Sequence, residues 1–283
     1  MKFLGTEYSV NTVDKAAIII LPIPYEFSTS YGKGTKNGPR AIIKASPYLE
    51  FYDEQYRIEP WREGIFTAES ITPDKTPQST MQSITRIVSS LIDRNKFIIS
   101  LGGEHSISYG IYRAYHGRFK DLSVLQMDAH SDIRDQYEGT KFSHACVMRR
   151  IWEMNSQIVQ VGIRSQSIEE SNFISKNHIK IMYAHQLYQY GFNERILEAL
   201  GENVYITLDV DFFDPSLMPS TGTPEPGGFQ WYESMVFLER VFTQKNVVGM
   251  DIVEYSPIKN LIAPDFMMAK LIYKLIACYL IGR

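Results

Sequence analysis

Three short clusters of histidine and acidic residues stand out because their side chains are typical metal ligands. They are residues 102–105 (Gly-Gly-Glu-His), 128–132 (Asp-Ala-His-Ser-Asp) and 209–211 (Asp-Val-Asp), and each follows a short apolar run. Four aspartates gathered beside buried strands would repel one another and lose solvation, whereas two divalent cations would balance their charge. The clusters taken together therefore predict a metal site, although any one of them alone would suggest a polar loop.

The ligand types indicate which metal and which chemistry to expect. Carboxylates with two imidazoles form an oxygen-rich set that favours Mn²⁺ over the thiolate-rich surroundings of structural zinc. A pair of such ions can lower the pKa of a shared water, which then attacks an electrophilic carbon at neutral pH. The predicted chemistry is hydrolysis, and the candidate ligands are His105, Asp128, His130, Asp132, Asp209 and Asp211.

The elements that must position these ligands are predicted from apolar runs separated by helix-length amphipathic segments. Strands are expected over 16–21, 97–101, 122–127, 158–161, 179–182, 204–208 and 247–253, and helices over 80–94, 106–115, 144–154, 193–200, 232–242 and 264–280. This pattern predicts an α/β protein with a mostly parallel sheet covered by helices on both faces. Ligands bind at the carboxyl ends of such strands. Strand alternation would align Asp128 with His130 and Asp132, and Asp209 with Asp211.

Composition narrows the class of protein. The chain has 283 residues, 44% of them hydrophobic and 22% charged, and its net charge of -3 comes without any Lys/Arg run, which argues against nucleic-acid and membrane-surface partners. Cys146 and Cys278 lie far apart, so we expect no disulfide framework and a cytoplasmic location. The apolar run 16–24 is too short to span a bilayer, and no repeat or linker divides the chain. We therefore expect one domain over residues 1–283 and a small substrate.

In this order, the three clusters resemble the metal motifs of the ureohydrolase family of arginases and agmatinases. The third continues as Leu-Asp-Val-Asp-Phe-Phe-Asp-Pro over 208–215, and similarity extends to Gly-Pro-Arg-Ala-Ile at 38–42 and Asp-Ile-Val-Glu at 251–254. The resemblance implies the three-layer α/β/α arginase fold, two Mn²⁺ ions per subunit, hydrolysis of a guanidino compound to urea and an amine, and a homo-oligomer, trimer or hexamer.

The resemblance also implies a role for each ligand. His105 and Asp132 would bind one ion, His130 and Asp211 the other, and Asp128 and Asp209 would bridge them. Asp132 would in addition accept a hydrogen bond from the metal-bridging hydroxide and help deliver a proton to the departing amine. His144, in Phe-Ser-His-Ala at 142–145, matches a family histidine that shuttles protons or contacts substrate at the pocket mouth, where the alternative is an ordinary loop histidine.

Three further residues are expected to bind the substrate. Glu254 matches the family glutamate whose carboxylate pairs with the guanidinium. Thr223 and Glu225 lie in the turn-rich segment 222–228 (Gly-Thr-Pro-Glu-Pro-Gly-Gly), a form similar to that of agmatinases. Thr223 would support the substrate, whereas Glu225 would either receive a cationic tail or order the loop.

The loop 133–144 bears most directly on substrate choice. Arginases carry there an asparagine- and serine-rich segment that recognises the α-amino and α-carboxylate groups of arginine, and this chain lacks it. The resemblance therefore favours agmatine, which would yield putrescine and urea. Guanidinobutyrate, aminopropylagmatine and arginine stay open: Arg134 or Lys141 would suit a carboxylate tail, whereas Asp135, Glu138 or Glu225 would suit an ammonium.

Two other classes of protein are less favoured. A non-catalytic regulator that kept the fold would usually have lost a metal ligand, and all six are present. A zinc deacetylase of related architecture would need only one catalytic metal.

Ser220 and Ala145 stand where relatives often have glycine, and these small residues bear on the substrate subtype more than on the metal chemistry.

Overall fold

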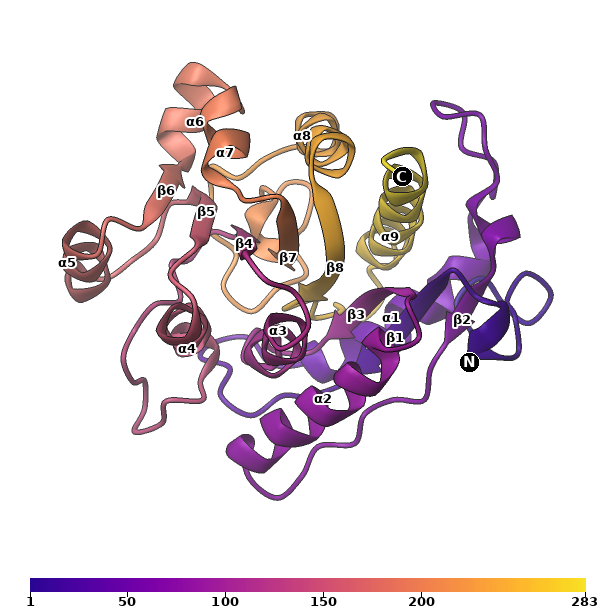
Figure 1. Cartoon of the computed structure of the whole chain (residues 1–283), viewed down its shortest axis with the longest axis horizontal. Coiled ribbons are helices and arrows are strands. Elements are labelled where there is room, and N and C mark those ends of the chain that lie inside the picture. Colours follow the sequence, from indigo (N-terminus) through magenta and orange to yellow (C-terminus); the bar gives the residue numbers. More distant parts are fainter.

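A computed structural model describes the whole chain, residues 1–283. Eight strands form one sheet in the order β2-β1-β3-β8-β7-β4-β5-β6, and every pair of neighbours is parallel. Helices cover both faces of this sheet (Figure 1). The prediction of a three-layer α/β/α fold is confirmed, and the sheet is parallel throughout.

The strands follow the predicted apolar runs closely. They are β1 (Ile18–Ile23), β2 (Ile65–Thr67), β3 (Phe97–Gly102), β4 (Leu122–Met127), β5 (Ile158–Ile163), β6 (Lys180–Tyr183), β7 (Asn203–Asp209) and β8 (Asn246–Val253). Only β2 has no counterpart among the predictions. It is three residues long and pairs with β1 alone at the edge of the sheet, so it leaves little pattern in the sequence.

The helices are α1 (Gly38–Ala45), α2 (Pro77–Ile92), α3 (Ile107–His116), α4 (Val147–Met154), α5 (Ile168–Lys176), α6 (Ala184–Tyr190), α7 (Glu194–Ala199), α8 (Trp231–Gln244) and α9 (Ala263–Ile281). Six of them match predicted helices. The helix expected from residue 144 begins as the 3-10 turn His144–Cys146 before α4. The helices α1, α5 and α6, which are seven to nine residues long, were not expected. Helices of about two turns offer few apolar positions from which a helical period can be recognised.

The sheet separates two apolar cores. All six residues of β1 are buried, and they alternate: Ile18 and Ile20 face the core formed with α1, α6, α7, α8 and α9, whereas Ile19 and Leu21 face the core formed with α2, α3, α4 and α5. Figure 1 shows α8 and α9 on one side of the sheet and α2 and α3 on the other. Burial on both faces explains why these strands are continuous apolar runs.

Four central strands carry the three clusters and Glu254 at their carboxyl ends. The strands β3, β8, β7 and β4 are neighbours in the sheet. Their carboxyl ends therefore bring together residues 102–105, 254, 209–211 and 128–132. The turn after β3 requires glycine, because a Cβ on Gly103 would lie 1.9 Å from the carbonyl oxygen of Tyr25. The fold thus assembles one site from segments far apart in the sequence.

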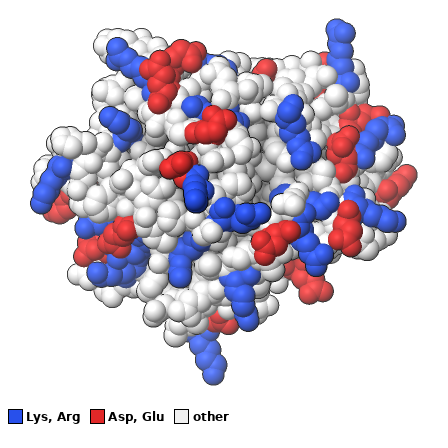
Figure 2. Space-filling view, viewed as in Figure 1, with Lys and Arg blue, Asp and Glu red and all other residues white.

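The exterior has no dominant charge on the face seen in Figure 2, where Lys and Arg are interspersed with Asp and Glu. None of the helices, α9 included, has both the length and the apolar character needed to cross a bilayer.

Candidate metal centre

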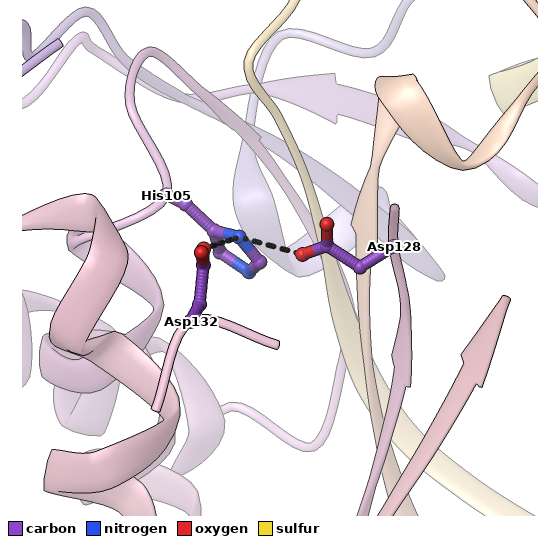
Figure 3. Close-up of side chains that lie close together, drawn as sticks. All are labelled: His105, Asp128 and Asp132. Carbon is purple, nitrogen blue, oxygen red and sulfur yellow. Dashed lines mark ion pairs between the residues drawn. The ribbon is translucent and has the colours of Figure 1, made fainter. Parts of the chain in front are cut away.

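One half of the centre surrounds the imidazole of His105. Its Nδ1 lies 3.2 Å from Asp128 Oδ2, 3.2 Å from Asp132 Oδ2 and 3.3 Å from Asp209 Oδ2. Figure 3 shows the ring held between Asp132 and Asp128. This nitrogen is buried and has no hydrogen-bond partner, so the group has the composition and geometry of a cation site.

The other half surrounds His130. Its Nδ1 lies 2.9 Å from Asp211 Oδ2 and 3.8 Å from Asp128 Oδ1. Asp128 therefore turns one oxygen toward each histidine, as a bridging ligand would. Asp209 differs, because its Oδ2 faces His105 while its Oδ1 accepts a hydrogen bond from the backbone N–H of Asp211 at 3.0 Å. The structure thus brings all six candidate ligands together.

Turns, and not strand alternation, aim two of these ligands. The strand β7 ends at Asp209, and Asp211 lies in the 3-10 turn Val210–Phe212 that follows. Asp132 lies five residues beyond the end of β4, with a φ of 51° in the left-handed region. The expectation that extended backbone would align Asp132 with Asp128 and Asp211 with Asp209 is wrong in its mechanism, because Asp211 lies in a 3-10 turn and Asp132 has a left-handed backbone.

A hydrogen-bonded chain beneath His105 orients its ring. His105 Nε2 lies 2.8 Å from Thr207 Oγ1, which in turn donates to Asp251 Oδ1 at 2.7 Å, and the Tyr205 hydroxyl donates to the other oxygen of Asp251. Because the threonine proton goes to Asp251, Thr207 accepts the Nε2–H of His105. The lone pair on Nδ1 is then directed at the three carboxylates, as metal coordination requires.

Two buried glutamines orient Asp128 in a similar way. Gln126 Nε2 donates to Asp128 Oδ2 at 2.8 Å, and Gln160 Nε2 donates to Gln126 Oε1 and to the carbonyl of Ser131. Sequence reasoning missed these supporting residues, together with Thr207. They do leave a signal, since each is a buried polar residue in a predominantly apolar strand.

The electrostatics of the centre call for positive charge. Burial and then the charges of Asp211 and Asp132 raise the pKa of Asp128 to about 7. Burial and the charges of Asp211 and Asp128 raise the pKa of Asp209 well above its ordinary value. Burial lowers the pKa of His105, but its carboxylate neighbours outweigh this and raise it well above the ordinary value. An oxygen-rich, crowded and desolvated donor set of this kind fits divalent cations.

A cavity of about 230 Å³ opens above the centre. His144, Thr223 and Glu254 all line it, together with the candidate ligands Asp132, Asp209, Asp211 and His130. Glu225 is not part of its wall; its Oε1 lies 3.8 Å from His130 Nε2. Three of the four residues expected to contact substrate or shuttle protons therefore share one chamber with the ligands.

Glu254 is held firmly at the base of this chamber. It is 8% exposed, its φ is 61°, and its Oε1 accepts the backbone N–H of His105 at 2.7 Å. Burial and then the nearby charge of Glu104 raise the pKa of Glu254 well above its ordinary value. A cation placed against this carboxylate would offset both effects.

Arg164 is a functional candidate that sequence reasoning missed. Its guanidinium donates to the carbonyl oxygens of Asp211 at 2.5 Å, Glu225 at 3.0 Å and Pro226 at 3.1 Å. It therefore ties the turn that carries one ligand to the loop 222–228. An arginine just after a strand is usually solvated, so nothing in the sequence indicated this clamp.

Comparison with known proteins places the chain in a family. A family model described as the arginase family matches residues 16–278. An N(1)-aminopropylagmatine ureohydrolase of Synechocystis sp. is 37% identical over 97% of this chain and 92% of its own length. An agmatinase of Pyrococcus horikoshii is 35% identical over 94% of this chain and 93% of its own.

A solved structure of a ureohydrolase is also similar to this chain. The agmatine ureohydrolase of Thermoplasma volcanium superposes with a TM-score of 0.89 and 32% identity, over 96% of this chain and 92% of that one. These matches confirm the family inferred from the three motifs. The chain belongs to the arginase family and is one of its ureohydrolases, hydrolases that act on guanidino compounds.

Proposed function

We propose that this ureohydrolase acts on a guanidine with a cationic amine tail, agmatine, and releases putrescine and urea with the help of two Mn²⁺ ions. The observation that carries the proposal is that the cavity wall offers no unpaired cation to a carboxylate tail. Arg134 is the only lysine or arginine in this wall, and it is paired with Glu170. The metal ions would balance Asp132, Asp209 and Asp211, and the guanidinium would balance Glu254, so the wall suits an amine tail better than an anionic one.

The two cations that could receive a carboxylate tail are already paired. Arg134 Nε lies 3.6 Å from Glu170 Oε2, and Lys141 Nζ lies 3.8 Å from Asp135 Oδ1. A guanidinobutyrate or arginine carboxylate would have to compete with these partners. The pairing supports an amine tail over a carboxylate tail.

N(1)-aminopropylagmatine is a second candidate, because relatives bearing the name of its ureohydrolase are 37% and 36% identical to this chain. It carries the same guanidinium and butyl spacer as agmatine and a longer tail with one more amine. Both substrates present the same reacting carbon to the centre, so the two candidates differ only in what the cavity mouth must receive.

The residues would divide the work as follows. His105, Asp128, His130, Asp132, Asp209 and Asp211 would hold the ions, which when bound supply Lewis acidity that activates water for attack on the guanidinium carbon. Glu254 would pair with the guanidinium N–H groups and orient that carbon. Asp132 would accept a hydrogen bond from the attacking water, while Thr223 and His144 would contact the substrate from the cavity wall. Glu225 would attract the cationic tail or order its loop.

Urea release tests the proposal directly. Metal-stripped protein is assayed with and without added Mn²⁺ against agmatine, N(1)-aminopropylagmatine, arginine and guanidinobutyrate, and Asp132→Ala serves as the control for contaminating activity. We expect Mn²⁺-dependent turnover with kcat/KM highest for an amine-tailed substrate. Preference for guanidinobutyrate or arginine would refute the amine-tailed assignment, and equal activity with or without metal would refute the metal mechanism.

Three broader expectations accompany this proposal. We propose that residues 1–283 form a single domain, since one sheet runs through the whole structure. We also propose a cytoplasmic location and a homo-oligomeric assembly, as the resemblance to the family implies.

A further inference from the structure

A buried glutamate outside the ligand set lies behind His144. Glu104 is 0% exposed, and its Oε2 accepts the backbone N–H groups of Phe27 and Ser28, the latter at 2.6 Å. Its Oε1 accepts the hydroxyl groups of Ser28 at 2.8 Å and Ser106 at 2.5 Å. Four donors converge on this side chain, as they do on an ionised carboxylate, which can only accept.

The hydrogen bond from Ser28 to Glu104 determines how the Ser28 oxygen can interact with His144. Because Ser28 donates its single hydroxyl hydrogen to Glu104, its Oγ can only accept from other groups. Two nitrogens of His144 approach that oxygen: the backbone N at 3.1 Å and the ring Nδ1 at 3.2 Å. An unprotonated Nδ1 would set two lone pairs against each other, so Nδ1 must carry the hydrogen.

The opposite ring nitrogen faces the cavity. His144 Nε2 lies 3.1 Å from the hydroxyl of the exposed residue Ser30, and both residues line the chamber. The Tyr137 ring meets the imidazole edge to face at 5.7 Å between centroids and limits its rotation. With the hydrogen on Nδ1, Nε2 offers a lone pair. The Ser30 hydroxyl donates to the Tyr137 hydroxyl at 3.3 Å, and because Ser30 is exposed it can rotate to donate to Nε2 until a ligand replaces it.

We propose that Ser28 and Glu104 are positioning residues that hold His144 in the Nδ1–H tautomer and present Nε2 to the cavity as a hydrogen-bond acceptor. An acceptor suits the guanidinium and ammonium groups of an amine-tailed guanidine, which offer only N–H donors. The link to substrate rests on the proposed function, whereas the tautomer rests on the hydrogen bonds alone. Ser28, Glu104 and His144 come from three separate segments that meet beside the site.

Ser143 offers a matched control. Its Oγ lies 3.3 Å from the same Nδ1, but no contact with Glu104 commits its hydroxyl hydrogen, so it can either donate or accept. Removing the Ser143 hydroxyl therefore leaves the tautomer of His144 unchanged. Removing the Ser28 hydroxyl abolishes the oxygen acceptor that selects the Nδ1–H tautomer.

The tautomer can be measured by NMR. Protein labelled with ¹⁵N at histidine and loaded with a diamagnetic divalent ion, Mg²⁺ or Zn²⁺, is recorded above neutral pH, and His144→Asn identifies the His144 signals among the six histidines. Wild type and Ser143→Ala should show Nδ1–H, and Ser28→Thr should retain it because the hydroxyl is kept. Ser28→Ala should shift the ring toward Nε2–H, the commoner form of unconstrained histidine.

Kinetics provide a second readout with agmatine as the probe. Loss of one directed hydrogen bond should lower kcat/KM of Ser28→Ala by about three- to tenfold, with metal content unchanged and with recovery in Ser28→Thr. An Nε2–H ring in the wild type, or a Ser28→Ala ring unchanged from the wild type, would overturn the proposal. Absence of urea from every guanidine would instead refute the proposed function, while the NMR result would still decide the tautomer.

Discussion

At the scale of single residues, two residues of the site have energetically unfavourable backbone conformations. Asp132 and Glu254 both adopt left-handed backbone conformations, with φ of 51° and 61°, and both are largely buried. Each such conformation costs a non-glycine residue on the order of 1 kcal/mol. Surroundings that hold these residues against that cost are typical of functional sites, which is why substitutions here should affect chemistry more than folding.

Asp132→Ala should abolish urea formation, because it removes a candidate metal ligand and the acceptor for the attacking water. We expect a loss of more than about 100-fold in kcat/KM, together with weaker metal binding. Asp132→Asn separates charge from conformation, since asparagine tolerates the left-handed region and should still lose most activity. Near-normal turnover of either variant would remove Asp132 from the mechanism.

Glu254→Gln should raise KM for agmatine by about 10- to 100-fold, because it replaces a charge-assisted pair with the guanidinium by a neutral one. The glutamine carbonyl can still accept the His105 N–H, so the fold and the metal content should be preserved. Steady-state kinetics with metal analysis measure both quantities. Unchanged kinetics would exclude Glu254 from substrate binding.

Metal uptake should release protons. Burial lowers the pKa of His130, but the charge and hydrogen bond of Asp211 outweigh it and raise this pKa to about 11, while burial and neighbouring charges raise that of Asp128 to about 7. At pH 7 the metal-free centre thus holds protons that ligation must displace, so affinity should rise with pH. Because His105 is shifted in the same direction, titration calorimetry in buffers of different ionisation enthalpy should detect at least about two protons released per chain. A proton balance of zero would contradict this picture.

At the scale of elements, adjacency of the four central strands creates the site. The clusters are separated by tens of residues in the chain, yet β3, β8, β7 and β4 lie side by side, so the clusters meet at the carboxyl ends of these strands. The connecting loops then set the orientation of each ligand. The loop 222–228 is one of these, and Arg164 joins it to the turn that carries Asp211.

Arg164→Ala should loosen both segments and weaken metal binding by about 10- to 100-fold, the range typical of residues that support ligands. Lysine should restore little, because it cannot contact several carbonyl groups with one planar fork. Metal titration compares these variants with Arg118→Ala, a control at an exposed arginine two residues after α3. Wild-type affinity in Arg164→Ala would show that the clamp does not position the ligand.

At the scale of the whole molecule, a buried ion pair joins the N-terminal half of the chain to α9. Lys274 Nζ lies 2.8 Å and 2.9 Å from the two oxygens of Asp53, and it sits over the ring of Tyr56 at 4.4 Å. Lys274 is one of the charged residues that interrupt the apolar pattern of α9. The helix is thus packed onto the sheet with its buried charge paired.

Lys274→Ala should lower the free energy of unfolding by about 3 to 5 kcal/mol, because it leaves the Asp53 carboxylate buried without a partner. The double variant Lys274→Met with Asp53→Asn should recover much of this loss. Urea denaturation measures both, and activity per folded molecule should not change. A loss below about 1 kcal/mol for the single variant would show that the pair is well solvated.

The sequence alone determined the class of fold, seven of the eight strands and the six candidate ligands. Each of these can be recognised within one short segment, from an apolar run or from residues of ligand type. Tertiary structure decided which oxygen of Asp128 faces which histidine, how turns aim Asp211, and that Arg164 clamps two loops. It also decided the contact between Ser28 and His144, which are 116 positions apart. Such contacts depend on loop geometry and strand order, which are set by packing of the whole chain and leave no periodic trace in the sequence.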